Sequence, residues 1–321
     1  MNREVEDTNQ KPLVSICTLV YNQEAFLSNY FEGVLSQQTN FLYEILIHDD
    51  ASTDNSAEII RDYQSRYPHL IKAIIQEENK YSQGVDINLT YNFPRVQGKY
   101  IALCEGDDYW TDPLKLQKQV DFLETHPTYN LYCHNWEVLN ETKVSPSPVH
   151  HLYQKPFSFT FATLPWVWIT KTMTLLFRHN IFDYNLLRRY EYSRDVHLVY
   201  HLLINGKGYF NPDVMSRYRI HGQGIWGGSE VDVKNETTYE LYKELYAFEK
   251  NKAVRKRYLN ATLALFNGKL YQKQSIKQFF QHFSLYAEAW RHVRDIKDLF
   301  FCIGGLIPTR FIHYIMRVFK I

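Results

Sequence analysis

The stretch YIALCEGDDYW, residues 100–110, decides the fold. Its apolar first half predicts a buried strand, and a helical pattern follows over residues 113–123. Three acids, Glu105, Asp107 and Asp108, therefore cluster at the carboxyl end of a core strand. In open α/β sheets this is the edge where ligands bind, and closely spaced carboxylates there repel one another unless a proton or a divalent cation neutralises them. The sequence predicts a metal site at this edge.

The composition is that of a globular protein with balanced charge. The chain has 321 residues, 45% hydrophobic and 16% aromatic, enough to bury a full α/β domain and a smaller appendage. Lysine and arginine total 36 against 35 aspartates and glutamates, so the overall balance does not favour bulk nucleic-acid binding. We expect no nucleic-acid partner and only local charge effects.

The N-terminus and the cysteines both favour the cytoplasm. Residues 1–10 lack the basic start and apolar core of a secretory signal. No stretch approaches the roughly 20 apolar residues that span a bilayer. The four cysteines are scattered, which suits a reducing compartment, and we interpret them as packing residues: Cys17, Cys104, Cys133 and Cys302.

The first part of the chain alternates between strand-like and helix-like segments, as a parallel sheet with crossover helices requires. The expected strands are 13–19, 43–48, 70–75 and 100–104, and the expected helices are 24–36, 55–67 and a weaker one at 87–96. This predicts a half-Rossmann arrangement. The dinucleotide fingerprint is absent, because YNQE, residues 21–24, stands where a Gly-rich turn would follow the first strand. A later G-x-G-x-x-G at 222–227 lies outside a strand-to-helix unit, so we interpret it as a loop.

The second part predicts a less regular order. Residues 139–165 carry four prolines and indicate an irregular connection. We expect strands at 172–178 and 215–220, a helix at 195–204, and helices from about residue 231. The expected organisation is a flexible N-terminus (1–11), one α/β domain (12–230), a helical region (231–298) and a tail (299–321).

The tail, residues 299–321, has the pattern of an amphipathic basic helix. Arg310, His313, Arg317 and Lys320 recur at helical spacing among apolar residues. Such a helix lies on an anionic membrane or docks on its own domain, and the sequence leaves both open.

A second group of acids ends another expected strand. Asp49 and Asp50 follow residues 43–48, and Ser52, Thr53 and Asp54 come directly after them. All these side chains suit helix caps and turns, which is the interpretation we favour for Asp54. For Asp49 and Asp50 a second interpretation stays open, because a carboxylate at this position can accept hydrogen bonds from a base edge or a ribose hydroxyl.

Further candidates differ in how specific they are. Oxygen ligands such as Glu105, Asp107 and Asp108 suit a hard cation, magnesium or manganese. Tyr109 and Trp110 either stack on a sugar or cap the core.

Asp195 begins a helix and needs no functional role as an N-cap. On that helix His197 and His201 lack the glutamate of H-E-x-x-H, which favours a surface or core pair over zinc. His221, before glycines, is either structural or a metal or phosphate contact.

Taken in order, these pieces resemble the family 2 glycosyltransferases. VSICTLVYN (14–22) is similar to their first strand and turn, and DDASTD (49–54) to their D-D-x-S-T-D element. EGDD (105–108) resembles their D-x-D-D metal motif, and Arg194-Asp195 their late acidic motif. The resemblance covers residues 12–222, and four ordered motifs are more specific than any one.

The resemblance implies a GT-A fold, a Rossmann-like nucleotide-binding sheet flanked by helices, here with a C-terminal helical extension. A nucleotide-sugar donor, most simply a UDP-sugar, would lie across the carboxyl edge of the sheet, with Asp49 or Asp50 at the nucleobase or ribose. The residues expected at the donor are Thr18, Tyr21, Asn22, Asp49, Asp50, Glu105, Gly106, Asp107 and Asp108. Two positions depart from the family pattern: Glu105 replaces the usual first Asp, and Leu19 replaces a common Pro.

The resemblance also implies the chemistry. Asp107 and His221 would hold a divalent metal, Mn or Mg, and Asp195 would be the general base of an inverting transfer. Arg194, with Tyr109 and Trp110, would shape the sugar or acceptor site. The acceptor would be a hydroxyl of a glycan or of a lipid-linked glycan in cell-surface polysaccharide synthesis, at the inner face of the cytoplasmic membrane.

Two other functions remain open at this point. One is a nucleotide-sugar-binding scaffold without turnover, which the presence of Asp107 and Asp195 disfavours. The other is a nucleotidyltransferase, which shares the metal carboxylates but normally has a Gly-rich basic phosphate loop after the first strand. Tyr21-Asn22-Gln23 is a poor substitute for such a loop.

Overall fold

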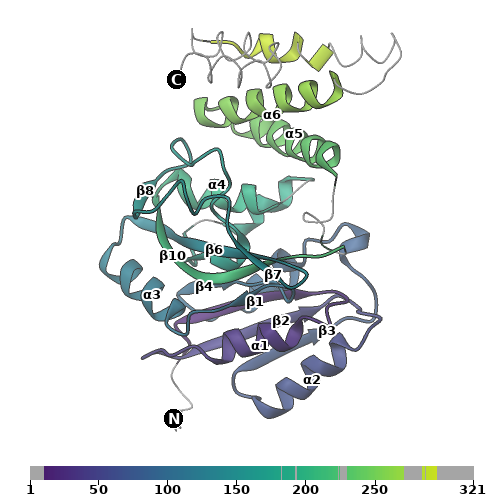
Figure 1. The fold of residues 1–321 in the computed structure, drawn as a ribbon, viewed down its shortest axis with the longest axis vertical. Helices are drawn as coiled ribbons and strands as arrows, with labels where there is room; N and C mark the ends of the chain where they lie inside the picture. Colours follow the sequence, from purple (N-terminus) through teal and green to yellow (C-terminus); the bar gives the residue numbers. More distant parts are fainter. Residues whose placement is uncertain are drawn as a thin grey trace. The chain divides into compact units, whose positions relative to one another are not determined.

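The computed structural model describes residues 11–181, 183–191, 194–222, 224, 230–270, 284–285 and 287–294. The chain forms two compact units (Figure 1). The first contains residues 1–189 and 195–222, and the second contains residues 190–194 and 223–321. The expected boundary at residue 230 falls shortly after this division. The tail, residues 299–321, and Cys302 lie outside the described residues, as does nearly all of the N-terminal segment 1–11.

The first unit is built on a mixed sheet with the order β3-β2-β1-β4-β9-β6-β10-β5, in which β7 pairs with β6 and β8 with β10. The first four strands are parallel to one another, and β9 joins them to the rest in antiparallel fashion. The strands are β1 (Val14–Val20), β2 (Tyr43–Asp49), β3 (Ile71–Ile75), β4 (Tyr100–Leu103), β5 (Tyr109–Trp110), β6 (Tyr129–Asn140), β7 (Lys143–Pro146), β8 (Phe157–Phe159), β9 (Leu176–Arg178) and β10 (Lys207–Ile220).

Four α-helices accompany this sheet in the described residues: α1 (Leu27–Leu35), α2 (Ser56–Arg66), α3 (Lys115–Thr125) and α4 (Asp195–Ile204). Each buries an apolar face, as in α3, where Leu116, Val120 and Leu123 are buried one or two turns apart. In α1 the close approach of β5 requires Gly33. A Cβ there would come within 2.7 Å of the Trp110 carbonyl oxygen, nearer than packed atoms allow.

The parallel half of the sheet confirms the predicted order. The strands expected at 13–19, 43–48, 70–75 and 100–104 are present within a residue or two, and so are the helices expected at 55–67 and 195–204, while the helix expected at 24–36 begins three residues later, at Leu27. These strands are short, mainly apolar runs between turn signals, and β1 and β4 are almost wholly buried, a pattern that depends only on local sequence. Cys17, Cys104 and Cys133 are buried, as expected of packing residues.

Several predictions for the less regular segments were wrong. The segment 139–165 is not simply irregular, since it contains the end of β6 and the short strands β7 and β8. The strand expected at 172–178 divides into a 3-10 turn, Thr172–Thr174, and β9. The weak helix at 87–96 is a π-helical turn, Asn88–Asn92, followed by a 3-10 turn, Phe93–Arg95.

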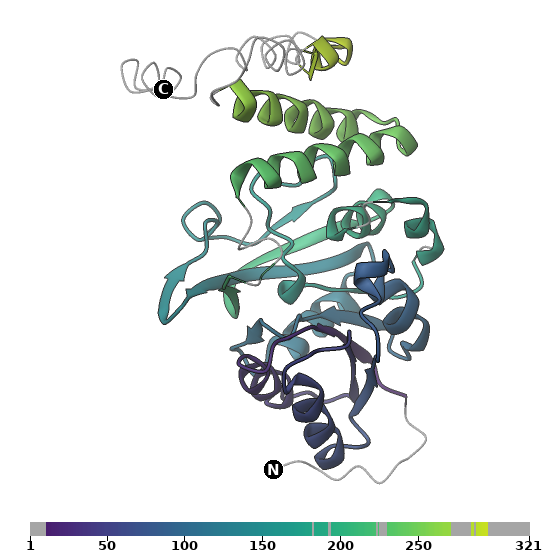
Figure 2. The same cartoon turned by 90° about the vertical axis from the view of Figure 1, so that its right-hand side faces the viewer.

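The long strands β6 and β10 were largely missed. They run side by side over most of their lengths (Figure 2), and β10 begins at Lys207, well before the expected 215. The start of β10 was expected too late because of a register shift between Asn211 and Val214. It surrounds Pro212, which cannot donate to the sheet and therefore reads as a break in the sequence.

The second unit contains the helices α5 (Val231–Phe248) and α6 (Lys252–Leu270), which pack against each other (Figure 2). Leu259, Leu263, Phe266 and Ala289 form its apolar cluster, and the hydroxyl of Tyr239 donates a hydrogen bond to Glu288. The helical character expected from residue 231 is thus present in the described residues. Within those residues no helix has the length and hydropathy of a membrane span.

Candidate active site

The acidic turn, residues 105–108, follows β4 at the carboxyl edge of the parallel strands. The Gly106 N–H donates to the Leu19 carbonyl at 3.1 Å, which fastens the turn to the end of β1. A Cβ on Gly106 would come within 2.5 Å of Gln23 Oε1 and 2.9 Å of a Val20 methyl, so the backbone approaches β1 as only glycine permits.

The acids of this turn lack full charge compensation. Burial, reinforced by the nearby Asp107, raises the pKa of the Glu105 carboxyl to about 8. Burial and the same Asp107 charge raise the pKa of Asp108 well above its ordinary value. Asp195 also contributes to the shift of Glu105, which shows that α4 brings a further carboxylate to this place. The turn therefore concentrates negative charge in a poorly solvated setting, where a cation is strongly favoured.

His221 meets the turn from the end of β10. Its Nε2 lies 2.9 Å from Asp107 Oδ2, although the two residues are 114 positions apart in the sequence. The His221 ring also packs on Phe26, with ring centroids 4.6 Å apart, so the imidazole has a fixed place. The structure thus brings together the two residues that the sequence put forward as metal ligands.

The pair fits a hard divalent cation that is completed by substrate. Among the described residues no three acidic, histidine or cysteine side chains are arranged as a ready-made metal cage. Magnesium and manganese, however, are usually held by one or two protein ligands together with waters and substrate phosphates. Asp107 and His221 supply that number of ligands.

Arg219 is a site residue that the sequence reasoning did not select. Its backbone N–H donates to Asp108 Oδ1 at 2.8 Å, and its Nε donates to the Asp107 carbonyl at 3.0 Å. Its Nη2 reaches Asn29 Oδ1 on α1 at 2.9 Å, and the guanidinium lies over the Phe26 ring. The available signal was strand alternation, because Arg219 and His221 are two apart and share one face of β10.

Asp195 is the first residue of α4, as predicted. The indole Nε1–H of Trp168 donates to its Oδ2 at 3.1 Å. The Tyr218 phenol, whose pKa burial raises to about 12, also feels the charges of Asp108, Asp107 and Asp195. Asp195 and the acidic turn therefore contribute to one electrostatic environment. Arg194 belongs to the second unit.

Asp49 and Asp50 are occupied by loop hydrogen bonds. Asp49 accepts from the hydroxyl and the backbone N–H of Ser52, at 2.5 and 3.1 Å. Asp50 accepts from the backbone N–H groups of Lys80 and Tyr81, both at 2.9 Å. These bonds shape the loops after β2 and β3, in agreement with the turn-forming interpretation that the sequence left open.

The loop after β1 is tied to the loop after β2. Asn22 Oδ1 accepts from the Thr53 N–H at 2.7 Å, and Asn22 adopts a left-handed backbone with φ of 52°. Asp54 accepts from the N–H groups of Glu24 and Ser56, the capping and turn role expected of it. Tyr21 is exposed at this edge.

Burial shows where four of the candidate side chains lie. Thr18 is fully buried and shares a hydrogen bond with the Tyr30 hydroxyl at 2.5 Å, so its side chain lies in the core and not at the donor. Trp110 caps the core, since it is 2% exposed and its indole donates to the Met173 carbonyl. His197 and His201 are buried, as a core pair would be.

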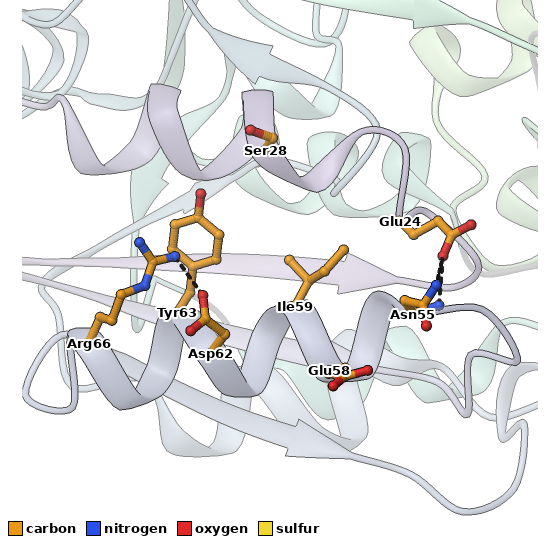
Figure 3. Close-up of a pocket in the computed structure, with 8 residues that line it drawn as sticks. All are labelled: Glu24, Ser28, Asn55, Glu58, Ile59, Asp62, Tyr63 and Arg66. Atoms are coloured by element: carbon orange, nitrogen blue, oxygen red, sulfur yellow. Dashed lines mark hydrogen bonds and ion pairs between the residues drawn. The ribbon is translucent and has the colours of Figure 1, made fainter.

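An open groove of about 410 Å³ lies between α1 and α2 (Figure 3). Glu24 and Asn55 are hydrogen-bonded at one end of it, and Asp62 and Arg66 form an ion pair at the other. No residue of the acidic turn lines this groove. It is therefore separate from the site built by Asp107, His221 and Asp195.

Comparison with known sequences identifies the family. Residues 15–187 match the glycosyl transferase family 2 model. The Mycobacterium tuberculosis protein Rv1520 is 35% identical over 230 residues, which are 68% of this chain and 62% of that protein. An Escherichia coli protein, UDP-Glc:alpha-D-GlcNAc-diphosphoundecaprenol beta-1,3-glucosyltransferase WfaP, is 30% identical over 143 residues, 43% of this chain and 54% of that protein. The chain thus spans less than two thirds of these relatives.

Solved structures share the fold. Residues 1–349 of Staphylococcus aureus TarS, in complex with UDP-GlcNAc, superpose with a TM-score of 0.61 at 15% identity, over 88% of this chain and 81% of that TarS chain. The mannosyltransferase PcManGT of Pyrobaculum calidifontis, in complex with GDP-Man and Mn²⁺, gives a TM-score of 0.55 at 14% identity, over 92% of this chain and 80% of PcManGT. With a GT-A-like mixed sheet and a family model that matches more than half of its length, the chain belongs to glycosyl transferase family 2.

Proposed function

We propose that this protein is an inverting, metal-assisted glycosyltransferase that moves a sugar from a UDP-sugar to a hydroxyl group of a glycan or lipid-linked acceptor. The observation that carries the proposal is the meeting of Asp107 and His221 at the carboxyl edge of the sheet, with Asp195 in the same electrostatic environment. Such an arrangement would supply ligands for a divalent cation that binds the diphosphate, and a carboxylate that acts as the base.

The donor would lie along the carboxyl edge. Asp107 and His221 would hold Mn²⁺ or Mg²⁺, which when bound stabilises negative charge on the departing diphosphate. Asp49, Asp50 and Asn22 would contribute by fixing the loops that form the nucleotide pocket, and the exposed Tyr21 ring would contact the nucleotide. Arg219 would keep the acidic turn in position.

Asp195 would act as the general base. The acceptor O–H bond breaks and its proton passes to the Asp195 carboxylate, while the acceptor oxygen forms a bond to the anomeric carbon of the sugar. The bond from that carbon to the phosphate oxygen breaks, and its electron pair leaves with the nucleoside diphosphate. Attack from the face opposite the leaving group inverts the anomeric centre, and one base suffices for such a single displacement. Tyr109 would border the sugar or the acceptor.

The acceptor class and the cellular setting rest on relatives. The name of WfaP describes transfer from UDP-Glc to GlcNAc on a diphosphoundecaprenol lipid, which supports a lipid-linked acceptor and cell-surface polysaccharide synthesis for this chain. The basic tail, residues 299–321, would bring a cytoplasmic enzyme to the inner membrane face. Liposome flotation of the full chain and of a variant truncated after residue 298 tests the tail, and equal flotation would contradict it.

The direct test is release of UDP from UDP-glucose and UDP-GlcNAc in the presence of Mn²⁺. We expect turnover by the wild type and its loss in Asp195→Asn, with donor-induced thermal stabilisation retained because binding to the folded state does not need the base. The exposed Asp62→Asn is the matched control. Donor stabilisation without any turnover in the wild type would instead favour the scaffold function.

A further inference from the structure

We propose that Trp168 is a positioning residue for the carboxylate of Asp195. The indole Nε1–H donates to Asp195 Oδ2 at 3.1 Å, across 27 residues of sequence. The inference rests on the proposed role of Asp195 as the base. It adds a residue that the motif at 194–195 does not contain, because the contact comes from the loop before β9.

The indole is held in place from its own segment. Ile169 and Thr170, which directly follow Trp168, are fully buried, so the backbone that carries the indole is anchored in the first unit. On the other side, Asp195 is fixed by the start of α4, where Val196, His197 and Leu198 are buried. Both partners of the hydrogen bond therefore project from anchored backbone, and the bond fixes the rotation of the carboxylate between them.

The chemistry of the donor suits this task. An indole N–H can only donate, so Trp168 orients Asp195 without competing for the proton that Asp195 is to receive. The other oxygen, Oδ1, accepts the Val196 N–H at 3.0 Å. A carboxylate oxygen has more than one lone pair, so the hydrogen bond from the indole does not by itself prevent the carboxylate from taking a proton. Hydrogen bonds to a carboxylate also favour its ionised form, the form that a base requires.

The indole N–H at 3.1 Å from Oδ2 thus has two effects on the Asp195 carboxylate, one on its orientation and one on its charge. Loss of the N–H should therefore impair the base in two ways, by releasing its orientation and by making it harder to ionise.

The chain offers a matched control two residues away. Trp166 lies on the same loop but is 59% exposed. Trp168→Phe keeps an aromatic ring and removes the N–H, and Trp166→Phe makes the same chemical change without touching the bond to Asp195. Any general effect on the loop should appear in both variants.

The first experiment measures UDP release from UDP-GlcNAc and UDP-glucose with Mn²⁺ as a function of pH. For Trp168→Phe we expect kcat to fall roughly tenfold to a hundredfold, the effect of one hydrogen bond to a charged group, with the donor KM unchanged. The acidic limb of its pH profile should move to higher pH. Trp166→Phe should match the wild type. A wild-type kcat and pH profile in Trp168→Phe would overturn the proposal.

A second experiment does not depend on turnover. The protein has six tryptophans, and labelling with 5-fluorotryptophan gives each a ¹⁹F resonance. The Trp168 and Trp166 signals are assigned by their loss in the two Phe variants. We expect the Trp168 signal to titrate at acidic pH in the wild type and to lose that titration in Asp195→Asn, while the Trp166 signal stays the same. A Trp168 signal that ignores Asp195→Asn would overturn the proposal even if the enzyme is active.

The two experiments separate the possible failures. If the wild type releases no UDP but the Trp168 signal follows Asp195, the positioning contact is real and the proposed function is wrong. If Asp195→Asn abolishes UDP release but Trp168→Phe changes neither the pH profile nor kcat, the base is correct and the positioning role is wrong.

Discussion

Two groups of acids lie at the same sheet edge but differ in their hydrogen-bond partners. Asp49 and Asp50, after β2, accept hydrogen bonds from the N–H and hydroxyl of Ser52 and from the N–H groups of Lys80 and Tyr81. Those bonds satisfy both carboxylates and build two loops.

The acidic turn after β4 is different. Burial, together with the charge of Asp107, raises the pKa values of Glu105 and Asp108, and Asp107 itself meets His221. We therefore predict a structural role for Asp49 and Asp50 and a cation at the turn that contains Asp107. The comparison indicates that the position of an acid at a sheet edge does not by itself define its role. The hydrogen-bond partners do.

The largest effect should come from Asp195. We expect Asp195→Asn to lower kcat for UDP release by about 10²- to 10⁴-fold, because a general base contributes about that factor. The amide keeps the shape and an oxygen acceptor for Trp168, so the free energy of unfolding should change little. Steady-state kinetics and urea denaturation check both points. If the activity of this variant is within a few fold of the wild type, Asp195 is not the general base.

A smaller loss is expected at Arg219, which holds the acidic turn by two hydrogen bonds. Arg219→Gln leaves the backbone bond to Asp108 but loses the guanidinium, and we expect kcat/KM to fall roughly tenfold to a hundredfold. Arg217→Gln is the control on the same strand, since Arg217 pairs with Glu137 and the Tyr109 hydroxyl. Equal kcat/KM losses in both variants would mean that the effect belongs to β10 in general.

At the structural acids the effect should be on stability. Asp50→Ala leaves the Lys80 and Tyr81 N–H groups without their acceptor, and we expect the free energy of unfolding to fall by about 3 kcal/mol. The kcat measured below the unfolding temperature should stay within a few fold of the wild type. Denaturation and kinetics on one preparation test this. A kcat collapse with unchanged stability would place Asp50 among the acids that act on the substrate.

The smallest effect concerns Lys115, a buried amine that lies over the Trp110 ring and donates to Gln119. Burial lowers its pKa to about 7. In the unfolded chain the amine keeps its proton to about pH 10.4, so between pH 7 and 10 the unfolded state binds more protons. The free energy of unfolding should therefore rise with pH there, by at most about 1.4 kcal/mol per pH unit.

Lys115→Met tests this assignment. The variant should lose that rise, which denaturation at pH 7.5 and 9 measures. If the free energy of unfolding of Lys115→Met rises with pH as steeply as that of the wild type, Lys115 is charged in the fold. A buried cation then lies beside β5, which follows the acidic turn.

The sequence predicted the parallel half of the fold because its signals are local. Buried strands such as residues 100–103 and the helix of Asp195 can be recognised within a window of about ten residues. The β6–β10 pair could not be, since it joins segments about 80 residues apart and contains Pro212 within a register shift. The helix expected at 87–96 was wrong because the π-helical and 3-10 turns found there have nearly the same periodicity as an α-helix.

Part of the candidate site was also selected from the sequence. Asp107, His221 and Asp195 were selected from motifs, and the fold places His221 against Asp107. The contacts of Arg219 with the acidic turn and of Trp168 with Asp195 were not predicted, because each joins residues that are distant in sequence. Burial could not be read from motif position: the Thr18 side chain, expected at the donor, is buried, and Trp110, for which stacking on a sugar and capping the core were both open, is also buried.

The central claim is that the turn at 105–108, and not the turn at 49–54, holds the cation. Electron paramagnetic resonance of free Mn²⁺, titrated with protein and UDP, measures this directly. We predict Mn²⁺ binding by the wild type and by Asp50→Asn, and at least tenfold weaker binding by Asp107→Asn and His221→Ala, since each removes one of two ligands. Unchanged Mn²⁺ affinity in Asp107→Asn, or its loss only in Asp50→Asn, would contradict the account.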